Sequence, residues 1–159
     1  MIKMDELKKL YEFLGFQNVK TYIQSGNVIF ESDEKDASKL QEIIEKKIEE
    51  IFGFDVRVFI RTPEELKRVI DQNPFPGENK GWYVIFCSAS CVGLPLEELQ
   101  KAKADSEQFS ISENGIYLLF PEGVGRTKLS NNFFEKKLKI SGTMRNWNTV
   151  NKLLEIVNR

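Results

Sequence analysis

The chain has 159 residues and a formal net charge of −1, with 23 Lys and Arg residues against 24 Asp and Glu residues. Its length allows one large domain or two small ones, and a hydrophobic content of 41% is typical of a globular protein with a buried core. The absence of histidine excludes Ser-His-Asp and Cys-His nucleophile systems and removes the commonest metal ligand.

The first 72 residues alternate between helical and strand-like periodicity. Apolar side chains at helical spacing end at Gly15 and again at Gly53, and glycine readily takes the left-handed conformation that ends a helix. After Gly53, the apolar residues Val56, Val58 and Ile60 recur at every second position, which predicts a half-buried strand. In chain order we expect a helix at 4–14, a hairpin of strands 19–23 and 28–30, a helix at 36–52, a strand at 56–60 and a helix from 63 to about 71.

The second half has its own series of elements. A stretch rich in Pro and Gly at 73–81 is the best linker candidate, and the apolar run after it predicts a central strand. The dipeptide Asn114-Gly115 is the strongest short signal for a hairpin turn. In chain order we expect a strand at 82–87, a helix from 95 to about 104, strands at 108–112 and 116–120, and helices at 130–138 and 146–157.

The order of these elements predicts the fold class. The second half reads β-α-β-β-α, and the first half reads α-β-β-α-β, which is the same order if one strand is missing ahead of Met1. Split β-α-β units of this kind form ferredoxin-like sandwiches, in which helices cover one face of an antiparallel sheet. We therefore expect an α+β protein of two tandem ferredoxin-like subdomains, 1–72 and 82–159, joined by a linker at 73–81, with the first subdomain lacking its first strand.

Composition also bears on location and cofactors. No apolar run reaches the roughly 20 residues that cross a bilayer, and the N-terminal segment has no signal-peptide pattern, so we expect a cytoplasmic protein without a membrane partner. Cys87 and Cys91 stand four residues apart, which is not the spacing of zinc or redox pairs, and we expect both thiols to be reduced. We expect no metal ion and no cofactor.

Positive charge is concentrated at the C-terminal end of the chain. Residues 121–159 contain eight basic and three acidic residues, a net of +5, so the remainder carries −6. Segregated charge of this kind favours an anionic partner. The residues expected to bind the anion are Arg126, Lys128, Asn131, Asn132, Arg145 and Asn146, with Lys136, Lys137 and Lys139 adding to the field.

Each of these residues also has an ordinary structural explanation. Asn131 and Asn132 stand in the first turn of an expected helix, where they either bind a ligand or supplement the helix cap. Arg145 is either an anion clamp or the partner of an acidic side chain. The lysines either supply the field for an anion or form a solvated helix face.

The first hairpin turn and a glycine-containing loop are further candidates. Gln24, Ser25 and Asn27 surround Gly26, and they either satisfy turn geometry alone or line a cleft. The loop at 123–128 resembles a phosphate-binding loop only superficially, because its two glycines stand too close together for that motif.

Three strings of the sequence carry a resemblance to a known family. They are KTYIQSGNVIF at 20–30, KLSNNFFEKKL at 128–138 and TMRNWNT at 143–149. The chain resembles, over essentially its whole length, the bacterial family called domain of unknown function 1697. The resemblance implies a two-subdomain ferredoxin-like α/β fold in a cytosolic bacterial protein, and it implies no established activity. It also implies a strand and a glycine-containing segment ahead of the first helix, which the sequence from Met1 lacks, and a missing strand opens a sheet edge to pairing with another chain.

Three functions fit these features. The first is a non-catalytic anion- or phosphate-binding module for nucleic acid or a phosphorylated small molecule. The second is an enzyme acting on a phosphorylated or carboxylated metabolite between the subdomains, with Lys128 or Tyr22 transferring a proton and Arg145 holding the substrate. The third is an interaction scaffold that pairs its exposed edge strand. The charge distribution favours the first function, and the sequence does not decide between a monomer and a dimer.

Overall fold

The structure, a computed structural model, describes residues 2–22, 26–75, 80–88, 96–113 and 115–158. The chain forms two compact units, Met1–Arg61 (unit 1) and Thr62–Arg159 (unit 2). The expected turn residues Gln24 and Ser25, together with Cys91 and Asn114, lie outside the described residues.

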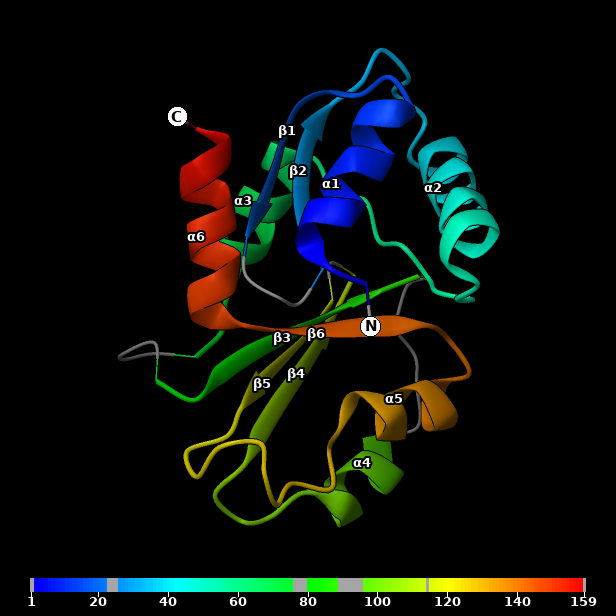
Figure 1. Cartoon of the computed structure of the whole chain (residues 1–159). Helices are drawn as coiled ribbons and strands as arrows, with labels where there is room; N and C mark the ends of the chain where they lie inside the picture. Colours follow the sequence, from blue (N-terminus) through cyan, green and yellow to red (C-terminus); the bar gives the residue numbers. More distant parts are fainter. Residues whose placement is uncertain (1, 23–25, 76–79, 89–95, 114, 159) are drawn as a thin grey trace. The chain divides into compact units, whose positions relative to one another are not determined.

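Unit 1 combines a two-stranded antiparallel sheet with two helices (Figure 1). Its elements are α1 (Met4–Phe13), β1 (Gln17–Tyr22), β2 (Asn27–Glu31) and α2 (Ala37–Phe52). Gly15 and Gly53 follow the two helices with φ angles of 91° and 76°, so both glycines take the left-handed conformation that their positions predicted. An apolar cluster joins the helices to the sheet, and Leu10, Val19 and Ile44 are buried in it.

The strand expected at 56–60 is not a strand in the structure. The segment pairs with no strand of the described residues, although Val56, Val58 and Ile60 pack against the apolar cluster of unit 1. Two of its backbone N–H groups bond instead to side chains of α2. Val58 N donates to Glu45 Oε2 at 2.8 Å, and Ile60 N donates to Gln41 Oε1 at 3.1 Å. The alternating pattern predicted burial correctly, but the strand prediction was wrong because a strand also needs a paired neighbour.

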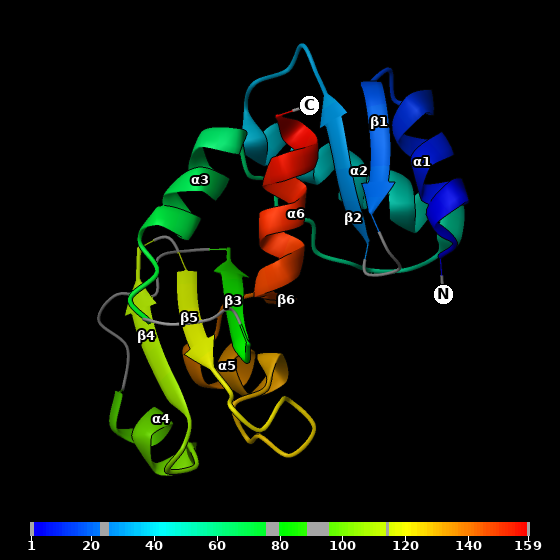
Figure 2. The same ribbon diagram turned by 90° about the vertical axis from the view of Figure 1, so that its left-hand side faces the viewer.

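Unit 2 is built on a four-stranded antiparallel sheet (Figures 1 and 2). Its elements are α3 (Pro63–Asp71), β3 (Trp82–Cys87), α4 (Leu96–Ala102), β4 (Gln108–Ser112), β5 (Gly115–Leu119), α5 (Asn131–Leu138), β6 (Gly142–Asn146) and α6 (Trp147–Val157). The strands lie in the order β4-β5-β3-β6, so the apolar strand β3 is central as predicted. The hairpin expected around residues 114–115 is the antiparallel pair β4 and β5.

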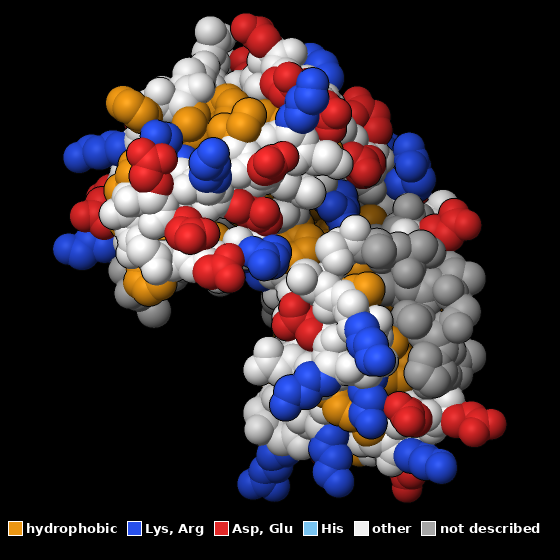
Figure 3. Space-filling view, turned by 90° about the vertical axis from the view of Figure 1, so that its right-hand side faces the viewer, with side chains coloured by type: hydrophobic (Ala, Val, Ile, Leu, Met, Phe, Trp, Pro, Cys, Tyr) orange, Lys and Arg blue, Asp and Glu red, His pale blue; other side chains and the backbone are white. Residues whose placement is uncertain are grey.

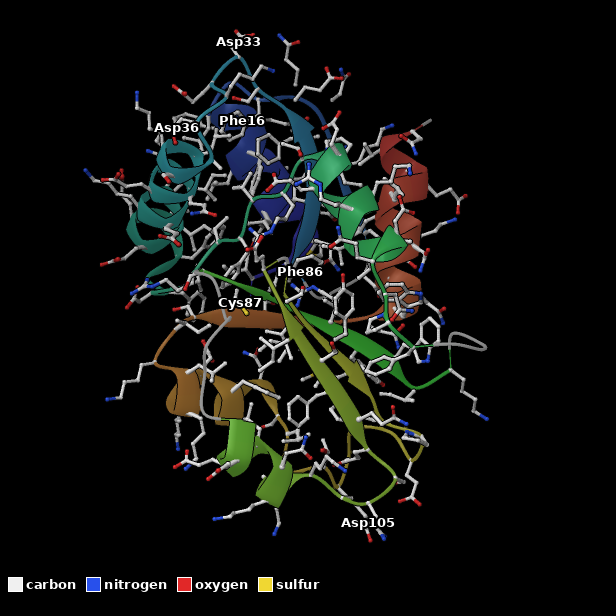
Figure 4. The ribbon with its side chains drawn as sticks, turned by 180° about the vertical axis from the view of Figure 1, so that it is seen from behind. Phe16, Asp33, Asp36, Phe86, Cys87 and Asp105 are labelled. Atoms are coloured by element: carbon white, nitrogen blue, oxygen red, sulfur yellow. The ribbon has the colours of Figure 1, made fainter. Side chains whose placement is uncertain are left out.

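Helices cover both faces of this sheet. Neighbouring residues of a strand point to opposite faces, and Phe86 and Cys87 of β3 belong to different apolar clusters (Figure 4). Cys87 lies in the cluster with Phe134 of α5, and Phe86 lies in the cluster with Trp147 of α6. Helices α4 and α5 therefore pack on one face, and α3 and α6 pack on the other. The expectation of helices on one face alone was wrong for unit 2.

Two further features of unit 2 differ from expectation. The strand β6 was not predicted, because its sequence GTMRN has neither an apolar run nor apolar alternation, and it forms by pairing with β3 from Gly142↔Cys87 to Asn146↔Tyr83. The helix at 63–71, expected in the first subdomain, belongs to unit 2, because Leu66 and Val69 pack in one cluster with Trp147. The chain divides at Arg61 and Thr62, ahead of the expected linker at 73–81.

The protein is thus a mixed α+β structure with two antiparallel sheets. The helix α3 begins near the expected residue with a capping box, in which Thr62 Oγ1 accepts from Glu65 N at 3.1 Å and Glu65 Oε1 accepts from Thr62 N at 3.0 Å.

Candidate functional site

The residues expected to bind an anion lie on two different faces of the unit 2 sheet. Arg145 of β6 pairs with Val84, and directly paired residues of antiparallel strands project to the same face. Val84 belongs to the cluster covered by α3 and α6. Asn131, in contrast, belongs to α5, which packs on the opposite face. The structure therefore does not bring Arg145 together with the residues around the start of α5.

Arg145 is partly buried and hydrogen-bonds within its own strand. Its Nη1 atom donates to Thr143 Oγ1 at 2.6 Å and to the backbone O of Met144 at 2.9 Å. Burial lowers the pKa of this guanidinium, because a charged group loses hydration when it is enclosed. These contacts fix the side chain along β6, and its role as an anion clamp stays a prediction.

Asn131 ties α5 to β6 together with Glu135. Asn131 Nδ2 donates to Gly142 O at 2.8 Å and to Glu135 Oε1 at 3.2 Å, and Glu135 Oε2 accepts from Gly142 N at 3.1 Å. The Oδ1 atom of Asn131 is buried without a hydrogen-bond partner among the described residues. The amide expected to bind a ligand thus holds the backbone of the strand at Gly142.

Asn146 and Ser130 are helix caps. Asn146 Oδ1 accepts from Asn148 N at 2.7 Å at the start of α6, and Ser130 Oγ accepts from Phe133 N at 3.1 Å at the start of α5. Ser130 directly precedes the first residue of α5, which is the position of an N-cap. Asn132, the remaining amide of the expected site, is exposed in the first turn of α5.

Four exposed cationic side chains remain before, in and directly after α5, and we call them the basic surface: Arg126, Lys128, Lys136 and Lys139. None of the four forms an ion pair with a carboxylate within the described ranges. Lys137 differs from them, because its Nζ lies 3.4 Å from Glu98 Oε2 of α4. Figure 3 shows Lys and Arg side chains gathered over the part of unit 2 that contains α4 and α5.

The aromatic side chains of this region are largely occupied by packing. Phe134 and Trp147 are only 1% and 4% exposed, so both belong to the core. Phe133 is half-buried, with Phe134 at 5.9 Å in an edge-on arrangement and Lys137 Nζ at 5.9 Å from its ring centre. This region therefore exposes charged side chains rather than aromatic rings that could stack on bases.

The hollow beside α5 is too small for a ligand. It lies between α5 and the sheet, is lined mainly by apolar side chains such as Ile85, Phe134 and Leu138, and has no room for a water molecule. A phosphorylated metabolite therefore finds no enclosed site there.

Of the hairpin candidate of unit 1, the described residues include Asn27. Asn27 is 7% exposed, and its Nδ2 donates to Tyr22 O at 3.2 Å, which closes the end of the hairpin. This contact agrees with the turn explanation for Asn27. Gln24 and Ser25 stand outside the described residues, so their part in a cleft stays a prediction.

The contact between α5 and β6 was missed at the sequence level. Glu135 and Gly142 were not singled out, although Asn131 and Glu135 are four residues apart and so share one face of a helix. That spacing is the signal that could have linked the two side chains.

In the described part of the chain, no group of three His, Cys, Asp or Glu residues could hold a metal ion. No helix within the described ranges is long and apolar enough to cross a membrane.

The fold and the basic surface define a two-unit α+β protein with an exposed cationic region on unit 2. Comparison with known proteins identifies the family to which the chain belongs. The chain belongs to the family described as "Protein of unknown function (DUF1697)", whose model matches residues 1–117, and the expected family is confirmed.

A solved structure is similar to this chain. It is the conserved bacterial protein SP0830 of Streptococcus pneumoniae, with a TM-score of 0.67 and 20% sequence identity over 98% of this chain and 88% of that chain. At this identity the likeness shows the fold alone. No curated protein matches the sequence.

Proposed function

We propose that unit 2 binds a polyanion through the basic surface of Arg126, Lys128, Lys136 and Lys139. One observation carries the proposal: all four side chains are exposed without an ion pair to a described carboxylate, and they belong to the stretch 121–159, which carries a net charge of +5. Unpaired cations on one region of a surface raise the local concentration of an anionic ligand. The protein is near neutral as a whole, so the attraction is local to this surface.

The ligand that fits this surface best is a nucleic acid strand held by its phosphates. The hollow beside α5 has no room for a metabolite, and Phe134 and Trp147 are too buried to stack on bases. Contacts limited to phosphates carry no sequence information. We therefore expect binding that depends strongly on salt and weakly on sequence.

The topology of unit 2 supports a finer description of its fold. Its elements β3, α4, β4, β5, α5 and β6 follow the order β-α-β-β-α-β, and the strands lie as β4-β5-β3-β6. We infer from this order that unit 2 is a ferredoxin-like sandwich. Helices α3 and α6 would then be additions to its second face, and unit 1 would be a shortened copy of the same sandwich.

The test is binding of labelled single-stranded RNA and DNA pools, titrated from low to physiological salt. The variant with Arg126, Lys128, Lys136 and Lys139 changed to Ala should lose most of the affinity and lower the salt slope by about 3, at roughly 0.7 per phosphate contact. The matched control changes Lys9, Lys20, Lys39 and Lys46 of unit 1 to Ala, because these four are also exposed and free of ion pairs in the described chain. Equal losses in both variants, or no binding even at low salt, would overturn the proposal. The single variant Arg145→Ala tests whether the opposite face of the unit 2 sheet contributes to the binding of RNA or DNA.

A further inference from the structure

The two aromatic side chains of α5 differ in how far the core encloses them. Phe134 is 1% exposed, whereas Phe133 is half-buried. Phe133 packs against the apolar cluster that contains Phe134 and Leu138, and the planes of the two phenylalanine rings stand at 87° to each other. Because the core encloses only part of the Phe133 ring, the remainder lies at the surface of α5.

The ring of Phe133 is covered by the side chain of Lys137. The two residues stand four positions apart and share one face of the helix. Lys137 Nζ lies over the ring at 5.9 Å from its centre, where the π electrons attract a cation. The side chain of Lys137 is 41% exposed, so it forms the outer layer of this contact. A molecule that approaches from the solvent therefore meets the lysine before it meets the ring.

Glu98 of α4 is the second partner of Lys137. The helices α4 and α5 cover the same face of the sheet (Figure 1), and Glu98 Oε2 lies 3.4 Å from Lys137 Nζ. Both side chains are partly exposed, and an ion pair of this kind contributes little because water and salt screen it. The contact with the ring is also close to the limit of about 6 Å at which a cation and a ring attract each other. A phosphate can therefore replace Glu98 as the partner of Lys137 at small cost.

The covered ring lies next to the basic surface. Lys136, one of its four cations, stands three residues after Phe133 and shares its side of the helix. In a single strand no complementary strand holds the bases, so a base can turn towards α5 while its phosphate stays at Lys136. An aromatic ring for a base beside cations for the backbone is the combination that binds single strands in other proteins.

We propose that Lys137 covers a stacking position for an unpaired base, and that this position makes unit 2 prefer single-stranded to double-stranded nucleic acid. When a strand binds, Lys137 leaves Glu98 for a phosphate, and a base takes the place of the ammonium group on the Phe133 ring. Every base has a π face, so binding stays weakly dependent on sequence. The inference rests on the proposed binding of a polyanion by the basic surface, and it adds unpaired bases to the description of the ligand.

Unit 1 contains the same combination of side chains and supplies a matched control. Phe13 is 75% exposed, and Lys47 Nζ lies over its ring at 5.2 Å from the centre. Lys47 Nζ also lies 3.5 Å from Glu50 Oε1. Phe13 is thus a ring under a paired lysine, but it belongs to α1 and not to the region of the basic surface. Removal of this ring should leave the binding of nucleic acid unchanged.

The test compares three probes at low salt with the full chain. They are a labelled single strand of about twelve thymidines, a DNA duplex of the same length, and inorganic polyphosphate, which has the charges but no bases. Phe133→Leu keeps an apolar side chain against the core and removes the ring. We expect it to weaken binding of the single strand by about five-fold or more and to leave the other two affinities unchanged. Phe133→Tyr retains a ring and should bind the single strand as the parent does, and Phe13→Leu should change none of the three affinities.

Glu98→Gln tests the release of Lys137 at an exposed position that does not touch the core. The substitution frees the ammonium group and should raise the affinity for the single strand by up to about five-fold. Circular dichroism checks that each variant is folded. Equal losses for all three probes in folded Phe133→Leu, an unchanged affinity of this variant for the single strand, or weaker binding by Glu98→Gln would overturn the inference. The proposed function survives these outcomes if the four-alanine variant of the basic surface loses affinity for every probe. If the parent binds none of the probes, both are overturned.

Discussion

The hydroxyl of Tyr117 donates a 2.7 Å hydrogen bond to the backbone O of Val69, 48 residues earlier in the chain. Val69 lies in the last turn of α3, where carbonyl groups lack partners within the helix. Tyr117 lies on the inner strand β5 and is 2% exposed. The bond therefore attaches α3 to the sheet of unit 2, in addition to the packing of Leu66 and Val69 in the cluster of Trp147.

Tyr117→Phe should destabilise unit 2 by about 1–3 kcal/mol, because it leaves a buried carbonyl without its donor. Urea unfolding followed by fluorescence measures the change. Tyr83→Phe is the matched control, since Tyr83 is half-buried and has no hydrogen bond from its hydroxyl in the described chain. We expect that control to stay within about 0.5 kcal/mol of the parent. Equal effects of the two substitutions would contradict a role for the bond to Val69.

The same tyrosine should make stability depend on pH in the alkaline range. Burial raises the pKa of Tyr117 from 10.0 to about 12. A group whose pKa is higher in the folded state stabilises it fully below the unfolded value, and this contribution is lost as pH rises from about 10 to about 12. Urea unfolding at pH 9, 10 and 11 should therefore show a decline that Tyr117→Phe reduces. A decline of the same size in the variant would assign the effect to other groups, such as Tyr11, whose pKa burial also raises.

Gly142→Ala should destabilise the pairing of β6 with β3. A methyl group at Gly142 would lie 2.8 Å from Ile85 Cγ2, and Ile85 is 1% exposed in the central strand. Overpacking of this kind costs about 1–3 kcal/mol. Gly125→Ala is the control, because nothing lies within 4 Å of its added methyl group. The free energy of unfolding from urea titration separates the two, and a neutral Gly142→Ala would show that the strand shifts to make room.

Local sequence patterns correctly predicted those features of the fold that depend on residues close together in the chain. Gly15 and Gly53 end helices through their own backbone freedom, and Thr62 with Glu65 forms a cap from residues three positions apart. The two errors in strand assignment have one cause. β6 has no strand pattern and becomes a strand because β3 pairs with it, whereas 56–60 has the pattern and finds no partner.

The candidate site was predictable only in part for a related reason. The exposure of Arg126 and Lys128 follows from their place in a charged loop before α5. Arg145 lies on the face opposite α5 because of the register in which β6 pairs with β3, and no local sequence pattern predicts this register. The structural role of Asn131 depends in the same way on a contact with Gly142, eleven residues away.

Glu135→Ala should lower stability without weakening anion binding. Its two oxygens accept hydrogen bonds from Asn131 Nδ2 and from Gly142 N, and both donors lose this acceptor in the variant. We expect a loss of about 1–3 kcal/mol in the free energy of unfolding. Lys136→Ala, the neighbouring exposed position, should show the reverse: unchanged stability and weaker binding of labelled single-stranded RNA.

Because Asn131 and Glu135 act together, the double variant Asn131→Ala with Glu135→Ala should lose less free energy of unfolding than the sum of the losses in the two single variants. Additive losses would mean that each side chain holds β6 independently.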